Sequence, residues 1–306
     1  MGTVVLSIDA ELAWGFHDLP DPPMERIRVA RDAWRWLLAE LDDWHIPATW
    51  AVVGHLFHDE CDGRHDSLTV PPGWFDRDPG GTHHDKRRWF GSGLIDAIRE
   101  AETQHDIGCH TYSHLSINTP GVTAAMFEQE LSTFQALAEE RDIEATSFVY
   151  PRNVIGYRPL LAQYGFRGYR GLPPMPWHFH TPLRPATKAI SLYGGEEAAP
   201  MVSPRVDEFG LVDVPASLYL YGFEGPLANG MRKLAGDPIL RAARRGIERV
   251  ATQPGVFHLW LHPNNLVSRR ERVRLRAILA TIDRTRSQRS LTVRTMEEVI
   301  DRHVPS

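Results

Sequence analysis

Apolar residues in this chain form short continuous runs that alternate with longer segments of helical periodicity. The apolar runs are rich in Val, Ile and Leu, which is typical of strands buried on both faces of a parallel sheet. They occupy residues 3–11, 48–54, 147–153, 166–169, 211–214, 255–265 and the start of 291–300. Segments with one apolar helical face occupy residues 26–41, 93–102, 124–141, 231–251 and 270–285. Repeated alternation of strand and helix predicts an α/β fold with a parallel sheet.

The length and the spacing of these segments predict one domain that spans residues 1–306. A chain of this length can bury a large core, and one barrel domain of this size is ordinary. Two irregular insertions interrupt the pattern at about 58–90 and 171–204. The first is longer than most loops in compact domains, which predicts either a functional lid or a partly disordered segment. Its aromatic residues Trp74, Trp89 and Phe90 would either stack on sugar rings or anchor the loop.

Composition and charge narrow the choice of partners. With 42% hydrophobic and 24% charged residues, the chain is globular, and its net charge of −5 argues against nucleic acid as a partner. Two cysteines, Cys61 and Cys109, do not make a disulfide framework. No apolar run approaches the roughly 20 residues needed to span a bilayer. Met1 leads directly into a strand that contains Asp9, so we expect a cytoplasmic protein without a signal peptide. The sequence leaves the oligomeric state open.

Two histidines follow a short apolar run at residues 107–109. His110 and His114 lie four residues apart, a spacing that places two imidazoles on one face of a helical turn, close enough to hold one metal ion. Solvated surface histidines are the alternative. The change from apolar to polar residues at this point is typical of a strand that ends in a loop, where barrel enzymes carry their chemistry.

The first strand ends in two carboxylates, Asp9 and Glu11. Residues two apart on a strand point to the same side, so both carboxylates can face one site. If a cation is bound there, one carboxylate can be its ligand and the other can take a proton from water. The alternative is a strand end capped by solvated acids.

Two further strands end in polar groups. Residues 147–153 run into Arg152 and Asn153, and residues 255–265 run into His262 followed by asparagines. Arg152 alone would fit a surface ion pair, and His262 alone would fit a core histidine. Together with the acids and the histidine pair they indicate an active-site rim.

These residues resemble the motifs of polysaccharide deacetylases of the carbohydrate esterase family 4 type. Ser7-Ile-Asp-Ala-Glu11 is similar to the family's acidic first motif, and His110-Thr-Tyr-Ser-His114 matches its H-(S/T)-x-x-H motif in full. Phe148-Val-Tyr-Pro-Arg-Asn153 is similar to the third motif but reordered, and Leu261-His262-Pro263 matches the last. The resemblance spans residues 4–299 and implies a distorted, incomplete parallel (β/α) barrel. Ala10 stands where many members carry the metal-binding Asp, so Glu11 would have to take that role.

The resemblance implies metal-dependent hydrolysis of an N-acyl group on a saccharide or glycan precursor. Glu11, His110 and His114 would hold a divalent metal, zinc by ligand type, although Co, Fe or Mn is possible. Which metal is bound, and whether Asp9 or Glu11 is its carboxylate ligand, stays open.

The resemblance also implies a role for each remaining motif residue. Asp9 would be the general base, Arg152 would keep it ionised, and His262 would be the general acid. We expect Tyr150, Asn153 and Trp14 to contact the substrate.

Two other functions are compatible with the sequence. Relatives of this fold hydrolyse C–N bonds in small cyclic amides or ureides. A catalytically silent glycan-binding barrel is the third possibility, and the intact set of acids, histidines and arginine argues against it.

Overall fold

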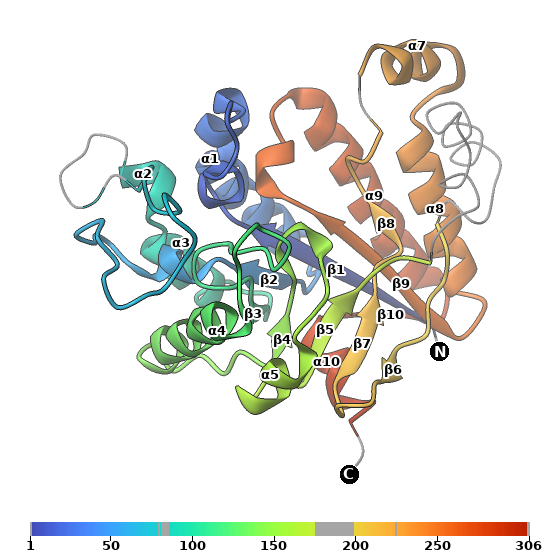
Figure 1. The fold of residues 1–306 in the computed structure, drawn as a ribbon. Coiled ribbons are helices and arrows are strands. Elements are labelled where there is room, and N and C mark those ends of the chain that lie inside the picture. The colour runs from blue at the N-terminus through green and yellow to red at the C-terminus, as the bar shows by residue number, and fades with distance from the viewer. Residues whose placement is uncertain (1, 79, 81–85, 175–198, 224, 305–306) are drawn as a thin grey trace.

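A computed structural model of the chain describes residues 2–78, 80, 86–174, 199–223 and 225–304 (Figure 1). Most of the second predicted insertion, residues 175–198, lies outside the described residues.

The strands form one curled sheet around the first strand of the chain. Among the described residues, nine strands join it in the order β6-β7-β5-β4-β3-β2-β1-β9-β8, and a tenth, β10, pairs with the start of β1. All pairs between these described strands are parallel except the antiparallel pair of β6 and β7. The strands are β1 (Gly2–Ala10), β2 (Thr49–Val52), β3 (Asp106–Cys109), β4 (Ser147–Phe148), β5 (Gly168–Gly171), β6 (Arg205–Val206), β7 (Val212–Pro215), β8 (Leu218–Tyr219), β9 (Gly255–Leu261) and β10 (Leu291–Arg294).

One short segment of chain, residues 212–219, bridges the two sides of the curled sheet. Its first half is β7, which pairs with β5, and its second half is β8, which pairs with β9. The sheet therefore comes close to a closed barrel without a continuous ladder between β5 and β9. The predicted incomplete (β/α) barrel is confirmed.

Helices cover the outside of the sheet (Figure 1). They are α1 (Met24–Asp43), α2 (Lys86–Trp89), α3 (Ser92–Arg99), α4 (Ala124–Glu139), α5 (Arg158–Gln163), α7 (Pro226–Ala235), α8 (Pro238–Val250), α9 (Arg269–Gln288) and α10 (Met296–Asp301). The single helix predicted over 231–251 is wrong. Gly236 has a φ of 79° and ends α7, and the Asp237 side chain then caps the first turn of α8, which begins with Pro238.

Alternation along β1 divides the interior into two cores. Val4, Leu6 and Ile8 belong to the main core, while Val5 belongs to a separate cluster that also contains Val299 and Ile300 of α10. Successive strand residues point to opposite faces, so Ser7 and Asp9 follow Val5 on its side of β1. That side of the strand therefore changes from apolar to polar toward its carboxyl end.

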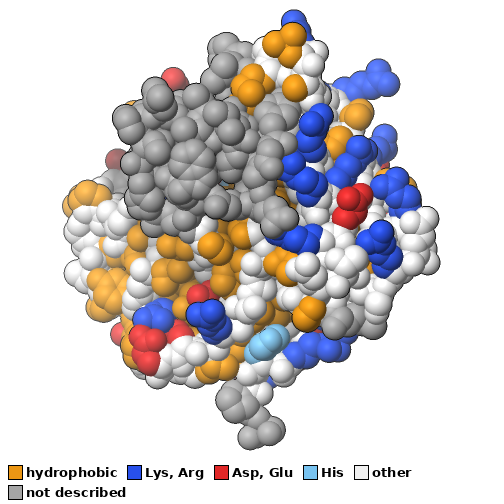
Figure 2. All heavy atoms as spheres, turned by 90° about the vertical axis from the view of Figure 1, so that its right-hand side faces the viewer, with side chains coloured by type: hydrophobic (Ala, Val, Ile, Leu, Met, Phe, Trp, Pro, Cys, Tyr) orange, Lys and Arg blue, Asp and Glu red, His pale blue; other side chains and the backbone are white. Residues whose placement is uncertain are grey.

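The face turned toward the viewer in Figure 2 carries many Lys and Arg side chains along one side. Helix α8, on the right of Figure 1, contributes the exposed Arg241 and Arg244 and buries Ile239 and Ile247. This distribution agrees with the apolar helical face found in the sequence at 231–251. None of the described helices is both long enough and apolar enough to cross a membrane.

Candidate active site

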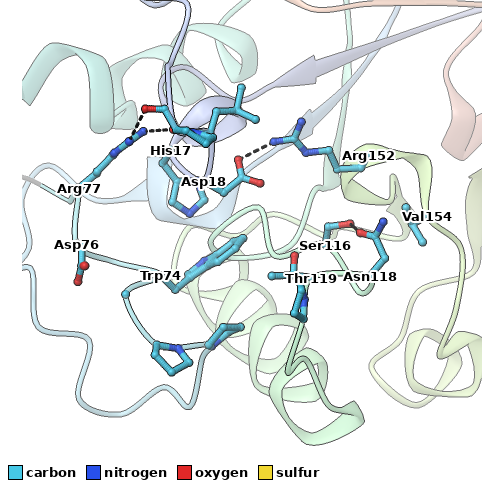
Figure 3. Close-up of a pocket in the computed structure, with 16 residues that line it drawn as sticks. His17, Asp18, Trp74, Asp76, Arg77, Ser116, Asn118, Thr119, Arg152 and Val154 are labelled. Carbon is cyan, nitrogen blue, oxygen red and sulfur yellow. Dashed lines mark hydrogen bonds and ion pairs between the residues drawn. The ribbon is translucent and has the colours of Figure 1, made fainter.

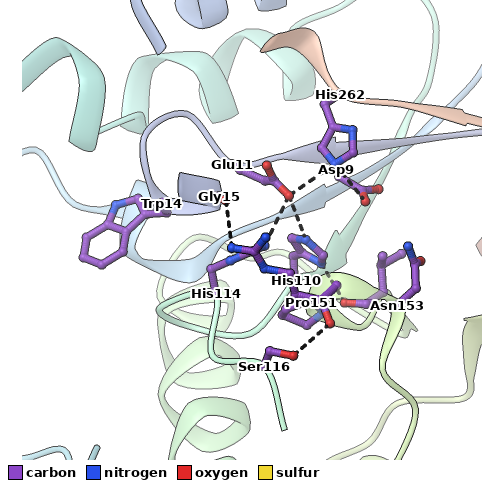
Figure 4. A network of polar contacts seen from close by, with 12 residues as sticks. Asp9, Glu11, Trp14, Gly15, His110, His114, Ser116, Pro151, Asn153 and His262 are labelled. Atoms are coloured by element: carbon purple, nitrogen blue, oxygen red, sulfur yellow. Dashed lines mark hydrogen bonds and ion pairs between the residues drawn. The ribbon is translucent and has the colours of Figure 1, made fainter. Parts of the chain in front are cut away.

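Polar side chains from loops at the carboxyl ends of β1, β3, β4 and β9 meet at one end of the barrel (Figure 4). In barrel enzymes this end carries the chemistry, because the loops there can vary without changing the core. The site pocket has a volume of about 190 Å³ and is bordered by Asp9, Glu11, His114, Asn153 and His262, among others. The structure thus brings together residues that lie far apart in the sequence.

Glu11 is at the centre of the histidines. Its Oε1 atom lies 3.3 Å from Nε2 of His110, 3.2 Å from Nε2 of His114 and 3.4 Å from Nε2 of His262. Burial opposes ionisation of Glu11, but His262 and His114 outweigh it and hold the pKa of Glu11 well below its usual range. Glu11 is therefore a carboxylate in the site.

The two histidines of the H-x-x-x-H motif are not on a helical turn, so that part of the prediction is wrong. They lie in a loop after β3, where Thr111 and His114 have φ angles of 58° and 61°. The left-handed backbone turns His114 back toward His110, and their ring centroids are 5.0 Å apart. Non-glycine residues rarely adopt this conformation, and such strain is typical of functional loops.

His110 is held in one orientation by the backbone. Its Nδ1 lies 2.7 Å from the carbonyl oxygen of Val149, so Nδ1 donates the hydrogen bond and Nε2 is left facing Glu11. A backbone carbonyl on the distal nitrogen is the usual way in which a metal-binding histidine is oriented.

The residues fit a divalent metal. The three ligand atoms of Glu11, His110 and His114 all lie within 4.8 Å of one another. Tetrahedral zinc with bonds of about 2.0–2.1 Å would separate its ligand atoms by about 3.3 Å, and Glu11 already lies at that distance from both imidazoles. Gly15 leaves the space that Glu11 needs, because a Cβ there would be 1.9 Å from Glu11 Oε2.

Arg170, not Arg152, pairs with Asp9. Its two terminal nitrogens lie 2.5 and 2.7 Å from the two carboxylate oxygens of Asp9, and both side chains are buried. Arg170 also donates to Asn153 Oδ1 at 3.0 Å and lies over the Trp260 ring at 4.4 Å. Burial raises the pKa of Asp9, but Arg170 and then His262 outweigh it, so the pKa is below its ordinary value.

The prediction that Arg152 holds Asp9 ionised is therefore wrong. Arg152 donates to Asp18 at 2.6 Å and is partly exposed at the rim of the pocket. Its φ of 59° turns it away from the path of β4. The sequence held a weak signal for Arg170, which directly follows the strand expected at 166–169; the structure extends that strand over Gly168–Gly171, and a charge buried inside a strand requires a partner.

His262 lies on the other side of the carboxylates. Its Nε2 is 3.6 Å from Asp9 Oδ2, and its Nδ1 is 3.3 Å from the hydroxyl of Tyr219. That hydroxyl donates to Asn265 Oδ1 at 3.0 Å, so it can accept a hydrogen bond from His262. Burial lowers the pKa of His262, but Glu11 and Asp9 outweigh this effect, and the pKa is raised. His262 is thus favoured in its protonated form. Tyr219 and Asn265 were not predicted from the sequence.

Two residues expected to contact substrate are part of the core. Trp14 is fully buried, and its indole nitrogen donates to the Trp89 carbonyl at 3.0 Å. Tyr150 is almost fully buried, and its hydroxyl donates to the Gly156 carbonyl at 2.8 Å. The expectation for both is wrong, because aromatic rings of this size are more often core than ligand contacts. Asn153, by contrast, borders the site pocket.

A larger cavity of about 820 Å³ lies beside the site pocket, and Arg152 borders both (Figure 3). Its walls include His17 and Asp18 after β1, Trp74 and Arg77 of the first insertion, and polar residues after β3. Trp74 is mostly buried and donates to Ser113 Oγ at 2.8 Å, so it both anchors the insertion and faces the cavity.

Comparison with known proteins places the fold. No family model matches the chain, and no curated protein matches its sequence. A protein from Mycobacterium smegmatis assigned as a polysaccharide deacetylase superposes with a TM-score of 0.63 at 16% identity, over 98% of this chain and 89% of its own. One from Pseudomonas aeruginosa PAO1, with the same assignment, has a TM-score of 0.61 at 13% identity over the same shares. PuuE allantoinase has a TM-score of 0.57 at 12% identity, again over 98% and 89%. The chain therefore has the fold of polysaccharide deacetylases, in agreement with the resemblance of its motifs.

Proposed function

We propose that this protein is a metal-dependent hydrolase that removes an N-acyl group, such as acetyl, from a saccharide or glycan precursor. The observation that carries the proposal is the arrangement around Glu11. Its carboxylate faces His110 and His114, while Asp9 and His262 lie beside it with opposite charge. The fold shared with polysaccharide deacetylases is consistent with this chemistry.

Glu11, His110 and His114 would hold the metal. A divalent cation bound there would polarise the acyl oxygen and lower the pKa of the attacking water. Zinc, cobalt, iron and manganese all bind carboxylate and imidazole ligands, so the metal is left to measurement.

Asp9 and His262 would divide the proton transfers between them. Water attacks the acyl carbon and gives a proton to Asp9, which Arg170 keeps ionised through two hydrogen bonds. His262, protonated beside two carboxylates, gives a proton to the nitrogen as the C–N bond breaks. The products are a free amine and a carboxylic acid.

The cavity beside the site supports a substrate larger than one small ring. Its volume of about 820 Å³ and its polar and aromatic walls suit a saccharide, which could reach the site pocket past Arg152. A small cyclic amide or ureide would fill only the pocket of about 190 Å³. The similarity in fold to PuuE allantoinase keeps this second substrate class in the test.

The experiment combines metal analysis with two substrate panels. Protein stripped of metal and reloaded separately with Zn²⁺, Co²⁺, Fe²⁺ or Mn²⁺ is assayed for acetate release from N-acetylated oligosaccharides and for ring opening of cyclic ureides. We expect acetate release that depends on metal and falls by about a hundredfold or more in Asp9→Asn, which keeps its metal. Asp96→Asn is the control, since Asp96 in α3 pairs with Arg141 and borders neither the site pocket nor the larger cavity.

Three outcomes would contradict the proposal. Ring opening without acetate release would select the second substrate class. Loss of metal in Asp9→Asn would exchange the roles of the two carboxylates. Tight binding of glycans without turnover, whichever metal is loaded, would support a catalytically silent glycan-binding protein instead.

A further inference from the structure

The first insertion gathers a second set of metal-binding side chains, separate from the candidate active site. His55 lies in a 3-10 turn (Gly54–Phe57) just after β2, and Cys61, His65 and Asp78 lie in the irregular segment that follows. One ligand atom from each of these four residues lies within 4.8 Å of all the others. We propose that these four residues form a second, structural zinc site, with His₂CysAsp ligands, that fixes the first insertion to the barrel.

The distances among the four side chains agree with a tetrahedral ion. Asp78 Oδ2 lies 3.1 Å from His55 Nε2, 2.5 Å from His65 Nε2 and 3.2 Å from Cys61 Sγ. Cys61 Sγ lies 3.8 Å from His65 Nε2. Zinc bonds of about 2.0–2.3 Å would place the ligand atoms about 3.3–3.6 Å apart. Binding therefore needs a shift of about 1 Å between Asp78 and His65 and smaller shifts elsewhere.

The buried His55 ring faces the other members of the cluster through its Nε2 atom. Its side chain is fully buried, and among the described residues its Nε2 has no hydrogen bond of acceptable geometry. The atom points instead at the oxygen of Asp78, whose side chain is also fully buried. His55, His65 and Cys61 thus all lie against one buried carboxylate oxygen, and a metal ion would give each of them a direct ligand bond.

The atoms of His65 and Asp78 that would not bind the metal have polar partners of their own, as in most metal sites. The Tyr112 hydroxyl lies 3.3 Å from His65 Nδ1, so the ring presents Nε2 to the cluster. The other carboxylate oxygen of Asp78 accepts a hydrogen bond from the Gly80 backbone nitrogen at 3.1 Å. Such outer contacts fix the orientation of ligands before the metal binds.

Zinc is the ion that this ligand set favours. A thiolate and two imidazoles exclude magnesium and calcium, which prefer oxygen ligands, and suit zinc. Four protein ligands close the coordination shell, which is typical of structural rather than catalytic zinc. The site also joins positions 55 and 78, which are separated by most of an irregular segment, and metal binding would stabilise that segment.

The position of the cluster gives the ion a function in the cavity. The His65 ring stacks on Phe75 at 4.0 Å between centroids, and the neighbouring Trp74 and Asp76 line the cavity of about 820 Å³. An ion bound by the cluster would hold Phe75 and its neighbours Trp74 and Asp76, and therefore this part of the cavity wall, in place. The second site would therefore shape the substrate cavity without touching the candidate active site.

Cobalt spectroscopy on the unmodified protein tests the proposal directly. The chain has two cysteines, and the candidate active site contains no thiolate ligand. Protein loaded with Co²⁺ should show a thiolate-to-cobalt charge-transfer band in the near ultraviolet. Cys61→Ala should lose the band, and the matched control Cys109→Ala should keep it.

Elemental analysis separates the two sites. We expect two equivalents of zinc in the full chain after it is stripped of metal and reloaded with zinc. One should remain in the double variant His110→Ala/His114→Ala, and one should be lost in His65→Ala. In the double variant, chelation of the remaining zinc should lower the Tm and open the 58–78 segment to protease.

Absence of the band in the unmodified protein would overturn the proposal, as would a double variant without zinc. Neither result bears on the acetate-release assay, so failure of this proposal is distinguishable from failure of the proposed function.

Discussion

Replacing Arg170 with methionine removes the positive half of the buried ion pair on Asp9. Methionine keeps much of the aliphatic volume of arginine, so the change mainly removes charge and hydrogen bonds. Both partners are almost completely buried, with side-chain exposures of 0% for Arg170 and 4% for Asp9. Asp9 would then be a buried carboxylate whose two closest donors are gone.

The expected loss of stability is about 3–5 kcal/mol, the range for breaking a buried pair by removal of one partner. Arg152→Met is the matched control. The Arg152–Asp18 pair is partly exposed, with side-chain exposures of 36% and 24%. Such pairs contribute about 0–1 kcal/mol, so the control should unfold almost like the unmodified chain.

Urea unfolding followed by circular dichroism measures both variants, and a double-mutant cycle isolates the pair. Asp9→Asn/Arg170→Met should be more stable than Arg170→Met alone, because it no longer leaves a charge buried without a partner.

Burial raises the pKa of Asp9 once Arg170 is absent, so Asp9 becomes ionised only at higher pH. The acid limb of the rate profile should therefore move to higher pH in Arg170→Met and not in Arg152→Met. Equal effects of the two substitutions, or a double variant no more stable than Arg170→Met, would refute this reasoning.

Three further predictions concern His262, Gly15 and the buried Asp106. His262→Ala should lower kcat by about 10²–10⁴-fold with unchanged metal content, the usual scale for a general acid; metal loss measured by elemental analysis would make His262 a ligand instead. Gly15→Ala should reduce metal affinity, because its Cβ would be 1.9 Å from Glu11 Oε2; titration with zinc showing normal affinity would disprove the crowding. Burial outweighs hydrogen bonds from Ser147 and Thr49 and raises the pKa of Asp106 from 3.8 to about 6. The native state therefore holds this proton more tightly, and its stabilising effect, complete below about pH 4, is lost as the pH rises to about 6. Asp106→Asn should raise the free energy of unfolding at pH 7 by up to about 3 kcal/mol, and unfolding curves with no gain at pH 7 would contradict it.

The pattern of apolar and polar residues in short stretches of sequence was sufficient to predict the main strands and helices of this protein. The apolar run before Asp9 became β1, and the periodic segments at 26–41 and 124–141 became α1 and α4. Strand and helix periodicity is set by residues that are close together in the sequence, so it can be recognised in a single sequence without a structure. The same holds for the chemical types at the strand ends, which indicated Glu11 and His262 before any distance was known.

Pairings across the barrel were decided by tertiary structure. Arg170 and Asp9 are 161 residues apart, and no periodicity states which of two arginines reaches a given carboxylate. Arg152 was the natural choice by motif, yet a left-handed backbone at that position turns it toward Asp18. Burial likewise placed Trp14 in the core, although we expected it to contact the substrate.

The first insertion shows the same division most clearly. By composition it was an irregular loop, and residues 55, 61, 65 and 78 have no regular spacing that identifies a site. The folded chain brings their four ligand atoms within 4.8 Å of one another. The sequence by itself thus determined the barrel and the kinds of side chain at its rim. Only the tertiary structure decided which of them meet, because convergence depends on how loops from different strands pack.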